Sequence, residues 1–221
     1  MVTSGITTVK YLLSNYKKHL SKWFSLPSIS DDQKLENLLK ELKDSTCLVI
    51  EFPYVDKLFR DSYYNYYSSA HKQTKRDTIR VSLFTTEISK DDLFDQEKQE
   101  LVQFSYVGFF VLRPLNGNFL GRSIISPNVL QTYNFVCCLS HHKSTLFGIP
   151  LEVHGFPYST QDTKMISCAE TSIWAITEYF GTKYPEYGLV LPNKIHSLLK
   201  STYYQRSLPK LISIRTSGFI C

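Results

Sequence analysis

Apolar residues near the start of the chain recur three or four positions apart, the spacing of one face of an α-helix. This first stripe consists of Val9, Leu12, Leu13, Tyr16, Leu20 and Trp23. Pro27 ends the predicted helix. Ser30 and Gln33 then predict a capping box that opens a second helix, whose stripe runs from Leu35 to Leu42. The segments Val55–Tyr67 and Asp91–Gln103 also indicate helices.

Short apolar or alternating runs between these segments predict strands. The predicted strands are Cys47–Phe52, Ile79–Leu83, Tyr106–Arg113, Arg122–Ile125, Tyr133–Leu139 and Leu151–His154. A polar loop, Ser159–Ser167, leads into a helix from Cys168 to Phe180 that Gly181 ends, and a short helix follows Pro192. The Cys168 helix carries an apolar stripe that we expect to be buried, consisting of Ala169, Ile173, Ile176 and Phe180.

The order of these elements predicts an α+β protein with N-terminal helices, a central and mainly antiparallel sheet, and helices at the end. We divide it into a helical and mixed region, residues 1–104, and a strand-rich region, residues 105–221, that leads into the Cys168 helix.

Composition narrows the class of protein. The 221 residues are 43% hydrophobic and 20% charged, which excludes a disordered chain. No apolar run approaches the roughly 18 residues of a membrane-spanning helix, so no membrane partner is expected. An odd number of cysteines, five, and the lack of an export signal predict free thiols and a cytoplasmic protein. The net charge of +5, without a dense basic run, does not favour nucleic acid.

One segment contains candidate catalytic residues. Ser167 and Glu170 fit a capping box, which places Cys168 at the first position of its helix. Unpaired backbone N–H groups and the positive end of the helix dipole favour the thiolate there, the nucleophilic form of cysteine. Gln161 lies seven positions upstream, so a loop can bring its amide to the sulfur, where it can donate to an oxyanion.

A glutamine, a short loop and a cysteine that opens a buried helix with a nearby Trp resemble the papain-like cysteine peptidase superfamily over Gln161–Phe180. The stretches Tyr106–Pro114, Leu120–Ser123 and His154–Tyr158 also resemble uncharacterised bacterial proteins with this motif. The resemblance implies a hydrolase of peptide, isopeptide or other amide or acyl bonds, with a protein or peptide substrate and neither cofactor nor metal. It assigns Cys168 as nucleophile and Gln161 as oxyanion donor.

The sequence differs from that family in the general base. The family's histidine follows the cysteine on a strand, whereas the one histidine after Cys168 is His196, on a short helix. We expect the papain-like domain to be incomplete, with its base outside this chain. Two alternatives stay open: a degenerate relative that acts as an interaction or sensor domain, or a base supplied by His196 or by one of His141, His142 and His154. His196 is therefore the third candidate catalytic residue.

Several residues also allow other interpretations. Cys168 could be a buried structural cysteine, as free cysteines often are. Cys137 and Cys138 lie near two histidines, but neighbours on a strand point to opposite faces and do not match zinc spacing. The tyrosines of Tyr63–Tyr67 fit a core helix face better than base stacking, so a nucleic-acid-associated protein is the weakest hypothesis. We expect Arg80 and Arg113 to form structural ion pairs or hydrogen bonds.

Overall fold

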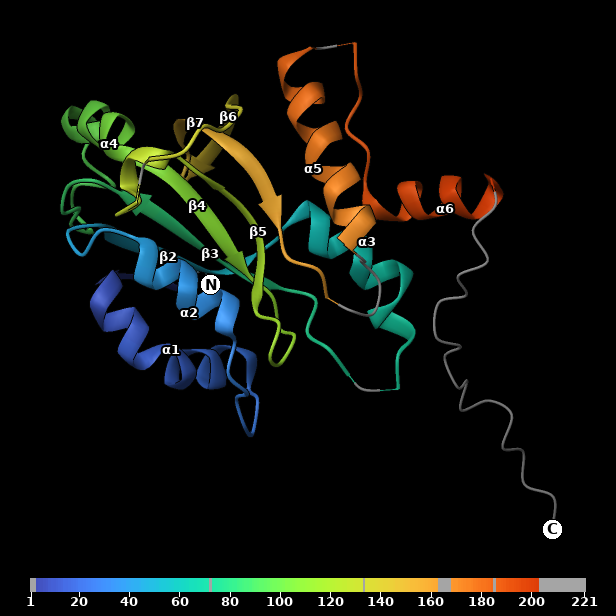
Figure 1. Cartoon of the computed structure of the whole chain (residues 1–221). Coiled ribbons are helices and arrows are strands. Elements are labelled where there is room, and N and C mark those ends of the chain that lie inside the picture. The colour runs from blue at the N-terminus through green and yellow to red at the C-terminus, as the bar shows by residue number, and fades with distance from the viewer. Residues whose placement is uncertain (1–2, 72, 133, 163–167, 185, 203–221) are drawn as a thin grey trace.

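A computed structural model describes residues 3–71, 73–132, 134–162, 168–184 and 186–202 and confirms the α+β class. Among these residues the chain forms six α-helices and a curled antiparallel sheet in the strand order β1-β2-β3-β4-β5-β7-β6 (Figure 1). The strands are β1 (Thr3–Thr8), β2 (Cys47–Tyr54), β3 (Thr78–Phe84), β4 (Tyr106–Leu112), β5 (Leu120–Ile125), β6 (Ser140–Leu146) and β7 (Ile149–Ser159). The helices are α1 (Val9–Phe24), α2 (Gln33–Glu41), α3 (Lys57–Asn65), α4 (Gln99–Ser105), α5 (Cys168–Lys183) and α6 (Pro192–Thr202).

The sheet is a meander from β1 to β5, because each strand pairs antiparallel with the next strand along the chain. β7 is long enough to take part in two pairings. Its first part, up to Gly155, pairs with β6, and its last part, from Phe156, pairs with β5. The pairing of β3 with β4 joins the predicted regions 1–104 and 105–221 within one sheet.

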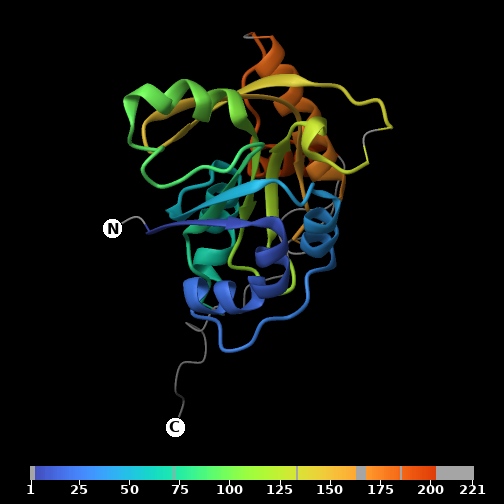
Figure 2. The same cartoon turned by 90° about the vertical axis from the view of Figure 1, so that its left-hand side faces the viewer.

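Helices α1 and α2 cover one face of the sheet (Figures 1 and 2). The stripe predicted for the first helix is buried there at Val9, Leu12, Tyr16 and Leu20, against residues such as Leu48 and Val81 of the sheet. This burial confirms the helical spacing read from the sequence, and it accounts for the stability of α1, because an isolated helix of this length is marginal in water.

The opposite face is covered by the β6–β7 hairpin, which folds back over β4, and by α4. Leu146, Leu151 and Val153 alternate inward from the hairpin, and Val102 comes from α4. A smaller cluster forms where α3, α5 and α6 meet, around Leu58, Trp174 and Ile195. It packs α5 against α3 and α6, while α5 also contacts the strands β6 and β7.

One predicted strand is wrong, and the two edge strands of the sheet were not predicted. The strand predicted over Tyr133–Leu139 is wrong over residues 134–139, which are irregular, and Tyr133 lies outside the described residues. The strand is β6 instead, whose sequence is mostly polar because it forms one edge of the sheet. β1 forms the other edge and was not predicted, since its sequence, Thr-Ser-Gly-Ile-Thr-Thr, lacks a clear apolar alternation.

Helix boundaries also differ from prediction, and α3 covers Lys57–Asn65 instead of the predicted Val55–Tyr67. Asp32 caps α2 by accepting from the N–H groups of Lys34 and Leu35, so the predicted capping box of Ser30 is wrong. α4 is shorter than predicted, and α5 continues through Gly181. The longest helices have 16 residues, and none of the described helices is long and apolar enough to cross a bilayer.

Candidate active site at the start of helix α5

The thiol of Cys168 lies at the first residue of α5 and is exposed to solvent. Its Sγ donates a hydrogen bond to Oε1 of Gln161 across 2.8 Å. The structure therefore brings together the two residues that the sequence placed in one site, and the α5 start agrees with the predicted helix start. Ser167, the predicted capping residue, lies outside the described residues.

The hydrogen bond shows how Gln161 can serve two states of the sulfur. With a neutral thiol the amide oxygen accepts. Rotating the amide by 180° about its last bond places the NH₂ group where the oxygen lies, so that the same side chain can donate to a thiolate or to an oxyanion.

Buried neighbours on both sides hold Gln161 in place. Thr160 and Asp162 are both buried. Arg113 donates from Nη1 to the carbonyl oxygen of Thr160, at 3.2 Å, and from Nη2 to its Oγ1, at 2.7 Å. The hydroxyl of Tyr67 donates to Oδ2 of Asp162 at 2.8 Å. Gln161 thus extends from a segment that is anchored before and after it.

Arg113 is the centre of that anchor. Its Nη2 also donates to the carbonyl of Leu120, the first residue of β5, at 2.7 Å and to that of Asn118 in the preceding loop at 3.3 Å, which confirms the predicted structural hydrogen bonds. Burial lowers the pKa of Arg113, and the charge of Asp162 opposes that shift. Gly121 leaves room for the side chain, because a Cβ at this position would lie 3.0 Å from Cγ of Arg113. Burial and the neighbouring Asp162 carboxylate raise the pKa of Tyr67, so its hydroxyl remains a donor.

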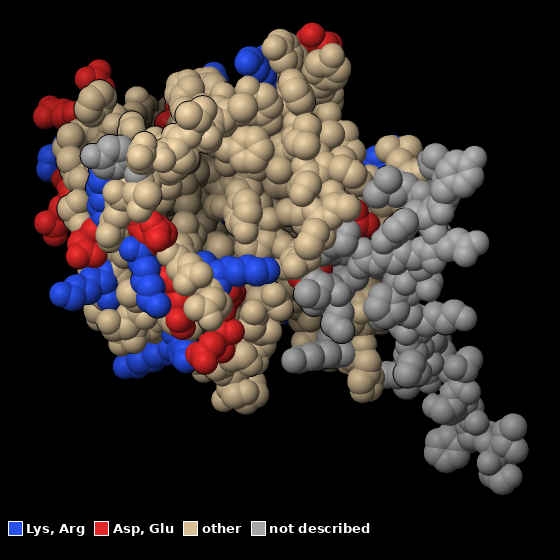
Figure 3. Space-filling model, viewed as in Figure 1, with Lys and Arg blue, Asp and Glu red and all other residues tan. Residues whose placement is uncertain are grey.

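The face that α5 buries is the reverse of the one predicted. Its buried residues are Glu170, Trp174, Ala175 and Glu178. The predicted stripe is exposed instead: Ile176 and Phe180 have exposed fractions of 51% and 44%. Figure 3 shows a broad surface over α5 and β7 with almost no charged side chains. The apolar face of α5 is therefore presented outward, close to the exposed Phe156 and Tyr158 of β7.

Buried carboxylates on the inner face of α5 are matched by cations from distant elements, as burial of charge requires. Oε1 of Glu178 accepts from Nζ of Lys57 at 2.7 Å and from Nη2 of Arg122 at 3.3 Å. Arg122 also lies 3.6 Å from Oδ1 of Asp56, the residue that caps α3. This network joins α5 to α3 and β5. No local pattern in the sequence indicates it, because its partners are far apart along the chain.

His196 lies with Glu170 and not with Cys168. Its Nδ1 is 3.0 Å from Oε1 of Glu170, and both side chains are buried. Residues two positions apart on an α-helix are separated by roughly 200° around its axis, so Glu170 and Cys168 lie on nearly opposite sides of α5. His196 thus supports the first turn of α5 from beneath and is not placed to take the Cys168 proton.

The other described histidines lie on other parts of the fold. His142 is buried on β6, with Nε2 2.8 Å from Oγ of Ser140, and burial lowers its pKa to about 4. His141 and His154 are stacked with their ring centres 4.8 Å apart. Among the hydrogen bonds of the described residues, none joins a histidine to Cys168.

Metal-ligating side chains do not gather in the described part of the chain. No group of three or more His, Cys, Asp or Glu residues there could hold a metal ion. Cys137 and Cys138 are both exposed and unbridged.

The chain was compared with models of protein families, with curated proteins and with solved structures, and none of the three comparisons found a match. The resemblance to papain-like peptidases consequently rests on the motif from Gln161 to Phe180. The site must be interpreted from its geometry.

Proposed function

We propose that the protein is a papain-like cysteine hydrolase that cleaves peptide, isopeptide or other amide or acyl bonds through Cys168. One observation supports this most directly: an exposed thiol at the first residue of a 16-residue helix, in hydrogen-bond contact with the amide of Gln161. Helix N-termini favour the thiolate, and a positioned amide can bind the oxyanion that forms when a carbonyl is attacked.

In the proposed reaction the Cys168 thiolate attacks the carbonyl carbon, and the oxygen becomes an oxyanion held by the backbone N–H of Cys168 and the NH₂ group of Gln161. The tetrahedral intermediate collapses to a thioester while the amine leaves with a proton. Water then hydrolyses the thioester and restores the thiol. Arg113 and Tyr67 act as positioning residues, because they hold the segment that carries Gln161.

The proton transfers require a general base, and we assign it to a histidine outside the printed sequence. His196 is occupied by Glu170 on the other side of α5. The exposed apolar face of α5 is consistent with a further segment that packs beside the site and completes it.

A thiol-reactive electrophile with a peptide-like backbone, used at neutral pH, tests the nucleophile. We expect the parent protein to be modified at Cys168, and Cys168→Ala to lose that fast modification. Cys138→Ala is the matched control, because Cys138 is also an exposed free thiol, and it should react like the parent. Equal labelling of the parent and Cys168→Ala would refute the assignment.

The second candidate is an interaction domain that keeps the fold around Cys168 without catalysis. The exposed apolar face of α5, with Ile173, Ile176 and Phe180, favours it, since exposed apolar patches commonly mark binding surfaces. The same labelling experiment separates the two functions. An interaction domain predicts that Cys168 reacts no faster than Cys137 and Cys138.

A further inference from the structure

Strand β1 leaves one edge of the sheet open, because β2 is its only partner among the described strands. Figure 2 shows it at the near side of the molecule, above α1. Natural sheet edges are usually protected by charges or proline, and the sequence of β1 contains neither. The opposite edge, β6, does carry such protection, because its Lys143 is exposed.

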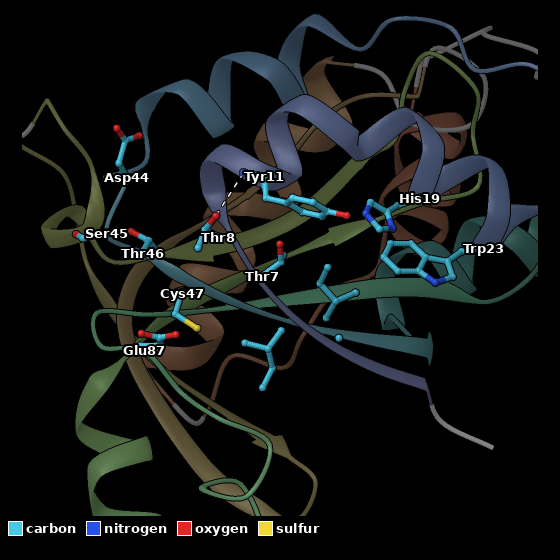
Figure 4. Close-up of a pocket in the computed structure, with 13 residues that line it drawn as sticks. Thr7, Thr8, Tyr11, His19, Trp23, Asp44, Ser45, Thr46, Cys47 and Glu87 are labelled. Carbon is cyan, nitrogen blue, oxygen red and sulfur yellow. Dashed lines mark hydrogen bonds between the residues drawn. The ribbon is translucent and has the colours of Figure 1, made fainter.

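A hollow of about 680 Å³ runs between β1 and α1, within the range of ligand-binding pockets (Figure 4). Helix α1 follows β1 directly and folds back along it, so one side of the helix faces the length of the strand. Three rings on that side line the hollow: Tyr11, His19 and Trp23. His19 is stacked on Trp23 with ring centres 5.1 Å apart, and Tyr11 is 5.7 Å from His19.

Gly5 keeps this hollow open. It pairs with Ile50 and so faces the same side of the sheet as that residue, the side covered by α1. No heavy atom lies within 4 Å of the position that a Cβ on Gly5 would take. A side chain that enters from outside can therefore occupy the space between Gly5 and the three rings.

Two carboxylates mark one end of the hollow. Asp44 and Glu87 lie beside Thr8 and Cys47, at the opposite end from Trp23 (Figure 4). Both are exposed, and neither forms an ion pair with a described residue. This end of the hollow is thus complementary to a basic group.

We propose that the free edge of β1 binds an extended segment of a partner protein as an added antiparallel strand. Main-chain hydrogen bonds to β1 hold the segment, and aromatic side chains at alternate positions enter the hollow beside Tyr11, His19 and Trp23. Antiparallel addition places the N-terminal end of the segment beside Thr8. A Lys or Arg at that end then meets Asp44 and Glu87. This site is separate from Cys168 and does not depend on the proposed hydrolase.

The probe is a fluorescein-labelled peptide, Arg-Ser-Tyr-Thr-Tyr-Thr-Tyr, whose binding is measured by fluorescence polarisation. We expect saturable binding with Kd on the order of 10 μM.

Gly5→Val fills the hollow at a strand position that tolerates valine, and we expect it to weaken binding at least tenfold, roughly 1.4 kcal/mol. Gly188→Val is the matched control, because Gly188 also has no atom within 4 Å of its Cβ position and lies after α5. It should bind like the parent.

Backbone pairing is tested separately with a peptide of the same sequence that is N-methylated at its alternate residues. The methylated residues are those whose N–H groups face β1, so methylation removes the donors that pair with the strand and should abolish binding. A peptide held only by nonspecific contacts of its aromatic side chains would still bind. The proposal is overturned if the unmodified probe does not bind, if Gly5→Val binds it as tightly as the parent, or if the N-methylated peptide binds equally well. Light scattering tests for a dimer that forms through β1. A dimer that is lost in Gly5→Val would mean that the edge binds a second copy of this chain and not a partner protein, and this would also overturn the proposal.

Discussion

At the scale of single residues, Gln161 is the side chain whose chemistry depends most on its placement. Thr160 and Asp162 fix the backbone on either side of it, and its amide contacts the Cys168 sulfur at 2.8 Å. The sequence could identify Gln161 and Cys168 because both belong to one short motif. It could not identify Tyr67, which reaches Asp162 from 95 positions away along the chain.

Changing Gln161 should change the reactivity of Cys168 in a graded way. Gln161→Ala removes one hydrogen-bond partner, and we expect the sulfur to react with iodoacetamide about threefold more slowly, the effect of roughly 0.6 kcal/mol. Gln161→Glu places a negative charge beside the thiolate and should slow the reaction about tenfold. Stopped-time labelling followed by mass spectrometry measures both rates. A Gln161→Glu variant that reacts as fast as the parent would show that the amide does not influence the sulfur.

His142 should make stability depend on pH. Burial lowers its pKa from the ordinary 6.5 to about 4 in the folded protein, so the unfolded chain binds the proton more readily. Stability contributed by the neutral ring is therefore complete above about pH 6.5 and is lost as the pH falls toward 4. Between pH 7 and pH 5 this loss amounts to about 2 kcal/mol.

Urea unfolding of the parent and of His142→Gln at the two pH values measures this contribution. The variant should lose about 2 kcal/mol less than the parent between pH 7 and pH 5. His154→Gln, at an exposed position of β7, is the control and should follow the parent. Identical pH dependence in His142→Gln and the parent would contradict the role of the buried ring.

At the scale of elements, α5 shows what a hydrophobic pattern can and cannot predict. Its start at Cys168 was predicted, but the face it buries was not. Two glutamates turn inward because Lys57, Arg122 and His196 supply partners from other elements. The sequence of a helix does not reveal partners that arrive from distant segments, so the apolar stripe appeared to be the core face.

Removing the Glu178 side chain should lower the free energy of unfolding strongly, because Glu178 is a buried partner of two cations. Glu178→Ala leaves Lys57 and Arg122 without their shared partner, and we expect a loss of about 3 kcal/mol in the free energy of unfolding. Glu186→Ala changes the same residue type at an exposed position beyond α5 and should stay within about 0.5 kcal/mol of the parent. Chemical denaturation measures both. A loss under about 1 kcal/mol in Glu178→Ala would mean that water satisfies these cations.

The two edge strands illustrate a related limit. β1 and β6 are rich in Thr, Ser, Gly and His, and their strand conformation comes from pairing with β2 and β7. Central strands such as β4 are buried along their whole length, and the sequence predicted them well. Local propensity therefore identified the middle of the sheet, while tertiary pairing decided its borders.

At the scale of the whole molecule, one sheet runs through both of the regions predicted from the sequence. β3 belongs to residues 1–104 and β4 to residues 105–221, and the two strands are neighbours. The core beneath α1 and α2 also draws Phe110 and Leu120 from the second region. Composition and element order could indicate the α+β class, but not which strands would be adjacent.

This continuity predicts that the chain unfolds in one cooperative step. Differential scanning calorimetry should show a single transition, and residues 1–104 expressed alone should lack the far-ultraviolet circular dichroism of a folded domain, because β3 then has no β4. Two separated transitions, or a folded 1–104 fragment, would contradict the single sheet as the unit of stability.

The reactivity of Cys168 relative to the other exposed thiols tests the proposed function most directly. Cys137 and Cys138 are free and exposed in the same chain, so they serve as internal standards for a limiting amount of iodoacetamide at pH 7. Peptide mapping by mass spectrometry then gives three rates from one sample. We predict that Cys168 is modified at least roughly tenfold faster than either standard. Equal rates at the three cysteines would show that the start of α5 and Gln161 do not activate the thiol, and would contradict the hydrolase.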